Sequence, residues 1–199
     1  MTITLYEYTP TRSAKVRWLL KEMAIEFTSV NDRHLIGSDE LKAINHTGKL
    51  PAIVVDGHAM FESSAICTYL ADKYPEKGLI PKAGTWARAM HEQWVSFALT
   101  EVEAHLWSTA RNTFIYPDAL KVPEIIEQNN RELASSLPII DGNLSHHSYM
   151  LGEDFSVTDI IVGFTTIWAH KQGLTQHLPK IEEYNLRLTE RPHCPLKFD

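Results

Sequence analysis

The stretch GKLPAIVV at residues 48–55, followed by ESSAI at residues 62–66, decides how the first half of this chain folds. Pro51 stands before a short apolar run, and because proline has no N–H for a sheet ladder it belongs at the start or edge of a strand. Ser63 supplies a hydroxyl where a helical pattern begins. The two segments place a proline beside a helix N-terminus, which favours anions. This arrangement predicts a small-molecule pocket.

The segments around this stretch predict a mixed sheet with helices packed on it. Two strand patterns are joined through a helical pattern, so their strands should be parallel, and Asp56-Gly57 between two short apolar runs predicts a hairpin. The βαβ-ββα order predicts an α/β, thioredoxin-like N-terminal domain. The expected elements are a strand at 3–8, a helix around 16–23, a strand at 27–30, a short helix at 39–44, strands at 52–55 and 59–61, and a helix after Glu62.

The second half of the chain predicts helices alone. Proline and glycine recur in residues 75–84, which is typical of a linker. Ser156 and Asp159 form a capping-box pattern ahead of an apolar helix, and Pro179 opens a last helix. A long helix running towards Arg111 and a second one over residues 123–146 complete the set. We therefore predict three parts: a thioredoxin-like domain at 1–78, a linker at 79–85 and an all-α C-terminal helical domain at 86–199.

Composition excludes several classes of partner. The 199 residues are 44% hydrophobic and carry a net charge of −6 without a dense Lys/Arg run, which argues against nucleic acid. No apolar stretch is long enough to cross a membrane, and the start of the chain has no signal-like pattern. The two cysteines are few and far apart, as expected for a reducing compartment. We expect a cytoplasmic location.

Four sequence blocks, in this order and spacing, resemble those of the cytosolic glutathione transferases. They are NHTGKLPA at 45–52, FESSAI at 61–66, YLADKYP at 69–75 and FSVTDI at 155–160. The segment 11–22 is also similar to the first helix of bacterial and fungal members. The resemblance covers almost the whole chain. It implies a homodimeric detoxification enzyme that binds glutathione, stabilises its thiolate and conjugates it to a small hydrophobic electrophile.

The resemblance also implies which residues bind glutathione. Pro51 should be cis, and Leu50 should offer backbone hydrogen bonds to the cysteinyl part. Glu62 should pair the γ-glutamyl ammonium, and Ser63 with the helix N–H groups should hold its carboxylate. As alternatives, Ser63 caps the helix and Glu62 complements its dipole. Lys49 either pairs the glycyl carboxylate or is a solvated charge.

The residue that activates the thiol should lie just after the first strand. A free thiol has a pKa of about 8.5, and a hydroxyl that donates to the sulfur contributes about 1.5–3 kcal/mol, which lowers that pKa by roughly one to two units. Alignment of the first helix with Ser-Arg-x-x-Arg members puts Thr11 at the serine position, so Thr11 is the first choice and Ser13, otherwise a helix cap, the second. Arg12 adds positive potential or is exposed. Other hydroxyls in this segment belong to Thr9, Tyr6 and Tyr8.

The remaining reactive residues favour no other chemistry. Cys67 falls inside a helix and should pack in the core, and no cysteine follows the first strand, so disulfide exchange is disfavoured. The histidines form no metal-ligand pattern, and we expect no cofactor, with glutathione as co-substrate. Against the first helices of the second domain we expect the second substrate. There Trp107 is a core or dimer-packing residue, and Glu103 would face the γ-glutamyl end across a dimer interface.

Two alternative functions stay open. A fold does not fix a function, and some relatives are non-enzymatic regulatory or scaffold proteins. If the protein is an enzyme, it could instead be a glutathione-dependent peroxidase or isomerase.

Overall fold

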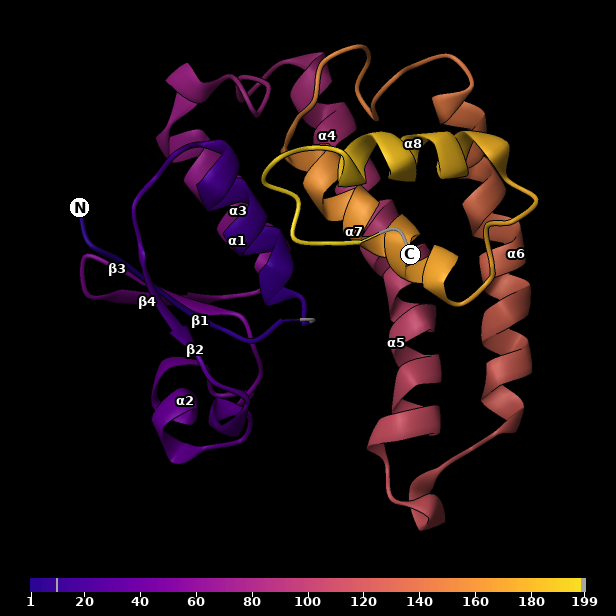
Figure 1. The fold of residues 1–199 in the computed structure, drawn as a ribbon, viewed down its shortest axis with the longest axis horizontal. Coiled ribbons are helices and arrows are strands. Elements are labelled where there is room, and N and C mark those ends of the chain that lie inside the picture. Colours follow the sequence, from indigo (N-terminus) through magenta and orange to yellow (C-terminus); the bar gives the residue numbers. More distant parts are fainter. Residues whose placement is uncertain (10, 198–199) are drawn as a thin grey trace.

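The first half of the chain folds into a four-stranded mixed sheet, in a computed structural model that describes residues 1–9 and 11–197. The order is β2-β1-β3-β4 (Figure 1). β1 pairs with β2 in parallel and with β3 antiparallel, and β3 and β4 form the predicted hairpin. The strands are β1 (Ile3–Glu7), β2 (Thr28–Asn31), β3 (Ala52–Val55) and β4 (His58–Phe61).

Helices cover both faces of this sheet. On one face, α1 (Ser13–Glu22) and α3 (Ser63–Lys73) bury their apolar sides against Ile3 and Leu5. On the other, η1 (Arg33–Leu35) and α2 (Asp39–Ile44) pack beneath Tyr6 and Tyr8. Alternate residues of β1 thus point to opposite faces, as the strand period requires. The predicted thioredoxin-like domain is confirmed.

Four strand boundaries, in β1, β2 and β4, differ from the prediction by one residue. β1 ends at Glu7 because the N–H and carbonyl of Tyr8 bond to the following turn rather than to a neighbouring strand. β2 runs to Asn31 because it pairs with β1 to its end, where Glu7 stands opposite Asn31.

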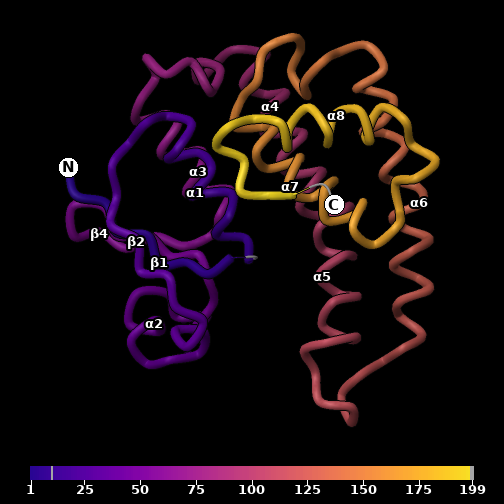
Figure 2. Tube along the Cα trace, viewed as in Figure 1, coloured from indigo at the N-terminus to yellow at the C-terminus, as the bar shows by residue number. Residues whose placement is uncertain are grey.

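The second half is helical: its first rod extends beyond the predicted end near Arg111, whereas α6 is slightly shorter than the predicted 123–146. Residues 86–115 form one rod in which π-helical turns, η3 and η4, alternate with α4 and α5, and α6 contains Pro138 in its interior. Figure 2 traces the rod down to a tip, from which α6 returns beside α5. The elements are η2 (Pro75–Lys77), α4 (Trp86–Phe97), η3 (Ala98–Glu103), α5 (Ala104–Ala110), η4 (Arg111–Ile115), η5 (Asp118–Leu120), α6 (Glu124–Leu144), α7 (Val157–Lys171) and α8 (Pro179–Thr189).

The predicted capping box starts the buried helix α7. The Asp159 carboxylate accepts the N–H of Ser156 at 2.8 Å and its hydroxyl at 2.9 Å. It also accepts the N–H of Met150 at 2.8 Å and the hydroxyl of Tyr184 at 3.0 Å. One carboxylate therefore ties the start of α7 to the preceding loop and to α8.

A single hydrophobic core joins the two halves of the chain, with α7 lying against both α1 and α3. The ring of Trp18 on α1 lies 5.8 Å from that of Phe155, which precedes α7. Near the other end of the chain, Arg191 donates two hydrogen bonds of 2.9 and 2.8 Å to Glu22. The last described residues therefore hold α1 from the far side.

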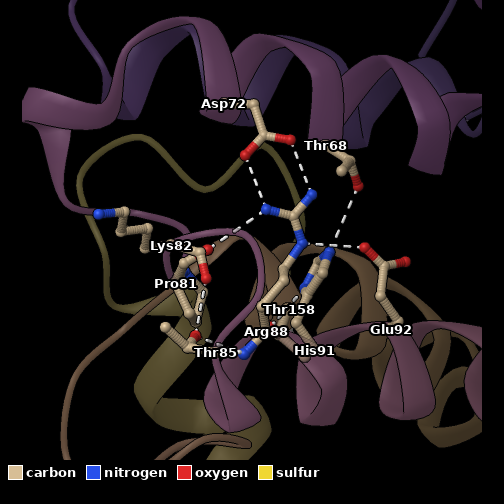
Figure 3. A network of polar contacts seen from close by, with 9 residues as sticks. All are labelled: Thr68, Asp72, Pro81, Lys82, Thr85, Arg88, His91, Glu92 and Thr158. Carbon is tan, nitrogen blue, oxygen red and sulfur yellow. Dashed lines mark hydrogen bonds and ion pairs between the residues drawn. The ribbon is translucent and has the colours of Figure 1, made fainter.

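A second polar link joins α3 to α4 (Figure 3). Arg88 donates two hydrogen bonds of 2.7 Å to Asp72 and one of 2.9 Å to Glu92. Beside it, buried His91 lies within hydrogen-bond distance of Thr68 and Thr158, at 3.3 and 2.9 Å. Burial lowers the pKa of His91, so its ring is neutral in this contact.

In the part of the chain that the structure describes, no helix is both long and apolar enough to cross a membrane.

Candidate functional site

Three of the predicted site segments meet at one edge of the sheet. Ala52, the first residue of β3, lies between Tyr6 of β1 and Phe61 of β4. The turn after β1, the Leu50-Pro51 bond and the start of α3 therefore leave the sheet on the same side. Residues far apart in sequence thus form one site because of the antiparallel register.

The Leu50-Pro51 peptide bond is cis, as predicted. Both residues are buried, whereas Lys49 is exposed. Neither the N–H nor the carbonyl of Leu50 forms a hydrogen bond with any residue that the structure describes. An unpaired backbone donor and acceptor side by side suit a ligand that itself carries a peptide group.

The loop before this bond is held by Asn45, which the sequence analysis did not single out. Its Nδ2 donates to the carbonyl of Lys49 at 2.7 Å, and its Oδ1 accepts the N–H and hydroxyl of Thr47 at 3.1 and 2.8 Å. The side chain is 2% exposed. An asparagine just before a Thr-Gly turn is the signal that indicates such a role.

The start of α3 offers unpaired donors. Glu62 occupies the N-cap position with φ 73°, a left-handed conformation that is costly for a residue with a Cβ, and its side chain is exposed. No side chain caps the helix, so the alternative that Ser63 acts only as a cap is wrong. The Ser63 side chain forms none of the hydrogen bonds found among the described side chains. With the first N–H groups of the helix, it forms a site for a carboxylate.

The two candidate thiol-activating hydroxyls occupy the same turn. Ser13 is fully buried, accepts the N–H of Tyr8 at 3.0 Å and lies 3.0 Å from the Tyr8 carbonyl. Thr11 is half-buried, and its Oγ1 lies 2.5 Å from that carbonyl and 2.6 Å from the Ser13 hydroxyl. Ser13 therefore closes the turn, whereas Thr11 can rotate towards a ligand.

A buried charge cluster lies directly behind this turn. Glu103, at the end of η3, is 4% exposed and forms ion pairs with Arg12 and with the fully buried Lys15. The hydroxyl of Thr165 on α7 donates to the same carboxylate at 3.1 Å. Burial alone would raise the pKa of Glu103, but Lys15 and Arg12 outweigh it and hold that pKa below its ordinary value.

This cluster corrects two expectations. Glu103 does not face outward across an interface, because its carboxylate is taken up by α1 of the same chain. Arg12 is not a solvated arginine: its guanidinium carbon lies 4.7 Å from the Trp107 ring centre and 5.6 Å from that of Trp168. The sequence signal that was missed is the spacing of Arg12 and Lys15, which puts both cations on one side of a helix.

Cys67 is buried in α3, and burial raises its pKa to about 12. A thiol in that state is a poor nucleophile, in line with the predicted core role. Within the described residues, no three His, Cys, Asp or Glu side chains are grouped to hold a metal ion.

Comparison with known proteins agrees with this geometry. Residues 1–72 match the family model for the N-terminal domain of glutathione S-transferase. The chain is 28% identical over 168 residues to glutathione S-transferase F10 of Arabidopsis thaliana, covering 80% of this chain and 77% of that protein. It is also 29% identical over 159 residues to elongation factor 1-gamma of Prunus avium, where the match covers 77% of this chain but only 36% of the longer protein.

Solved structures agree in fold. The glutathione transferase URE2P6 of Phanerochaete chrysosporium, solved in complex with oxidized glutathione, superimposes with a TM-score of 0.85 at 23% identity. The superposition covers 97% of this chain and 93% of that one. At this level of identity the likeness concerns the arrangement of the sheet and the helices.

Proposed function

Because the chain belongs to the glutathione S-transferase family, we propose that it is a glutathione transferase, which conjugates glutathione to a hydrophobic electrophile. The observation that carries this proposal is the pair of unpaired groups at one sheet edge. These are the backbone of Leu50 before the cis proline and the Ser63 hydroxyl at the uncapped start of α3.

These groups match two chemically distinct parts of glutathione. The Leu50 N–H and carbonyl suit the cysteinyl peptide, and the start of α3 suits the γ-glutamyl carboxylate. The exposed Glu62 carboxylate supplies a partner for the γ-glutamyl ammonium. Lys49, exposed beside the cis bond, is the cation available for the glycyl carboxylate.

Thr11 is the hydroxyl that we assign to thiolate stabilisation. When its hydrogen turns from the Tyr8 carbonyl to the sulfur, the charge-assisted hydrogen bond favours the thiolate over the thiol. The Arg12 and Lys15 charges directly behind this turn add positive potential, since one carboxylate, Glu103, is shared between two cations. The thiolate is the nucleophile and the thiol is not.

We further propose that glutathione is the sole co-substrate, without a metal or organic cofactor, and that the protein acts as a cytoplasmic homodimer. Both cysteines are unpaired, which supports a reducing compartment.

The likeness to elongation factor 1-gamma favours a second candidate, a non-enzymatic regulatory or scaffold role. The start of the first helix also supports this candidate, because Thr11 occupies the position that is serine in members whose first helix begins with Ser-Arg-x-x-Arg.

One pair of measurements separates the two candidates. Glutathione is titrated into the protein by calorimetry, and conjugation is then assayed with a panel of neutral aryl halides. We expect binding with a dissociation constant in the common range for enzyme substrates, about 1 μM to 1 mM, together with turnover. Binding without turnover across the panel supports the non-enzymatic candidate, and no binding at millimolar glutathione overturns the transferase proposal.

A further inference from the structure

The rod of the helical domain carries an aromatic and cationic cluster next to the Thr11 turn. We call Arg12, Trp107, Arg111 and Tyr116 the Trp107 cluster. The guanidinium carbons of Arg12 and Arg111 lie 4.7 and 5.9 Å from the centre of the same Trp107 ring. Arg111 also lies 5.7 Å from the ring centre of Tyr116. Because Arg12 directly follows Thr11, this cluster borders the place where the thiolate would form.

Arg111 differs from Arg12 in having no carboxylate partner among the described residues. Its Nε is buried and without a hydrogen bond, and its guanidinium makes no ion pair with any residue that the structure describes. The residue as a whole is half-buried, so its guanidinium is partly desolvated. An unpaired, partly desolvated guanidinium is costly unless an anion binds it.

The charged side chains near Arg111 do not neutralise one another. Arg12, Lys15 and Arg111 are three cations, and Glu103 is the carboxylate that pairs with two of them. This local excess of positive charge stands in a chain whose net charge is −6. One charge of the excess is balanced by the glutathione thiolate, and the charge of Arg111 is left for a second anion.

We propose that the second substrate is an aromatic electrophile that carries an anionic group such as a carboxylate. Its ring stacks beside Trp107 and Tyr116, and its carboxylate accepts paired hydrogen bonds from Arg111. This inference rests on the proposed transferase function and adds the substrate class to it.

For an aryl chloride the step balances without a further reactant. The thiolate sulfur attacks the ring carbon that bears chlorine, the C–S bond forms, and chloride leaves with the electron pair of the C–Cl bond. The thiol proton has already passed to solvent. The carboxylate of the substrate takes no part in the bond changes and serves recognition alone.

The test uses two substrates that differ at a single carboxyl group, 4-chloro-3,5-dinitrobenzoate and its uncharged methyl ester. Each rate is divided by the uncatalysed rate with glutathione, which corrects for the different reactivity of the two rings. We expect the Arg111→Gln variant to lose about 10- to 100-fold in kcat/KM for the acid, the range for hydrogen bonds to a charged group, and to keep the ester rate within about twofold. Arg111→Lys should retain part of the preference. Arg131→Gln, which removes an exposed arginine of α6, is the matched control and should change neither.

Binding of the two glutathione conjugates, measured by calorimetry, provides a readout that needs no turnover. The acid conjugate should bind wild type more tightly than the ester conjugate, and Arg111→Gln should abolish the difference. If the ester reacts while the acid shows no Arg111-dependent advantage in rate or in conjugate binding, the substrate class is wrong and the transferase function stands. If neither substrate reacts and neither conjugate binds, the proposed function fails, and this inference fails with it.

Discussion

Two hydroxyl groups within three residues have different tasks in the turn after β1. The Ser13 oxygen is buried and accepts the Tyr8 N–H, so it satisfies a backbone donor that would otherwise be unpaired. The Thr11 hydroxyl is half-exposed; it contacts the Tyr8 carbonyl and the Ser13 hydroxyl, which both have other partners, and its oxygen accepts the Ser13 N–H over a longer distance of 3.3 Å. Loss of Ser13 should therefore affect folding, and loss of Thr11 should affect chemistry.

Thr11→Val replaces the hydroxyl by a methyl of similar size. We expect the thiol pKa of bound glutathione to rise by roughly one to two units, because the sulfur loses a charge-assisted hydrogen bond. The ultraviolet absorbance of the thiolate, followed against pH in the presence of glutathione, measures this. A variant that keeps the signal, while a folded Ser13→Ala loses it, would show that Ser13 is the activating residue.

Ser63→Ala removes the unpaired hydroxyl at the start of α3 and leaves the helix N–H groups in place. We expect glutathione binding to weaken by about tenfold, as for the loss of a hydrogen bond to a charged group, with little change in thermal stability because Ser63 caps nothing. Calorimetry and a thermal melt measure the two effects. Ser135→Ala, at an exposed serine of α6, should change neither, and unchanged affinity in Ser63→Ala would exclude the carboxylate site.

At the scale of single elements, close helix packing depends on one glycine. A Cβ at Gly163 of α7 would lie 2.2 Å from a methyl carbon of the buried Leu188 on α8. α7 and α8 can approach this closely because position 163 has no side chain. The hydrophobic periodicity that predicts each helix says nothing about the distance between two helices, so it cannot predict this close approach.

Two glycine substitutions therefore have opposite expected effects. Gly163→Ala should lower the free energy of unfolding by about 1–3 kcal/mol through overpacking. Gly142→Ala, in α6 where an added Cβ meets nothing within 4 Å, should raise it by up to about 1 kcal/mol through helix propensity. Urea unfolding of both variants is the measurement, and equal stabilities would contradict the assigned packing.

For the whole molecule, carboxylates hold the two halves together. Burial alone would raise the pKa of Glu22, but hydrogen bonds from Arg191 and Trp18 outweigh it and lower that pKa. The pKa of Glu103 is also lowered, because Lys15 and Arg12 outweigh the effect of burial. The hydrogen bonds from Arg88 lower the pKa of Asp72. Each therefore binds protons less readily in the folded than in the unfolded chain.

The contribution of these carboxylates to the free energy of unfolding should be fully present above about pH 4, the pKa of a carboxyl group in the unfolded chain. It should be lost as the pH drops through and below that value. We expect the melting temperature to decrease steadily below about pH 5. Glu22→Gln should lower it by a few degrees at neutral pH, at about 2–4 °C per kcal/mol, and weaken the acid dependence. Glu183→Gln, which removes an exposed glutamate of α8, is the control. A melting temperature independent of pH from 3 to 7 would refute the assigned role.

The sequence by itself determined the elements and their order. The alternation in β1, the Asp56-Gly57 hairpin, the proline before β3 and the capping box of α7 are local patterns, and local geometry follows from them directly. They also located the proposed ligand-binding edge, because an antiparallel hairpin brings its own flanking residues together. The elements that these local patterns predict do not depend on contacts with residues far away in the sequence.

Only the tertiary structure decided which charges are neutralised. Glu103 meets Arg12 and Lys15 from 91 and 88 residues away, and Arg111 is left unpaired beside Trp107. A pairing of this kind depends on how α1 packs against the helical domain, and no spacing within either segment contains it. The same long-range packing buries Ser13 fully and leaves Thr11 only half-buried, although the two hydroxyls lie two residues apart in sequence.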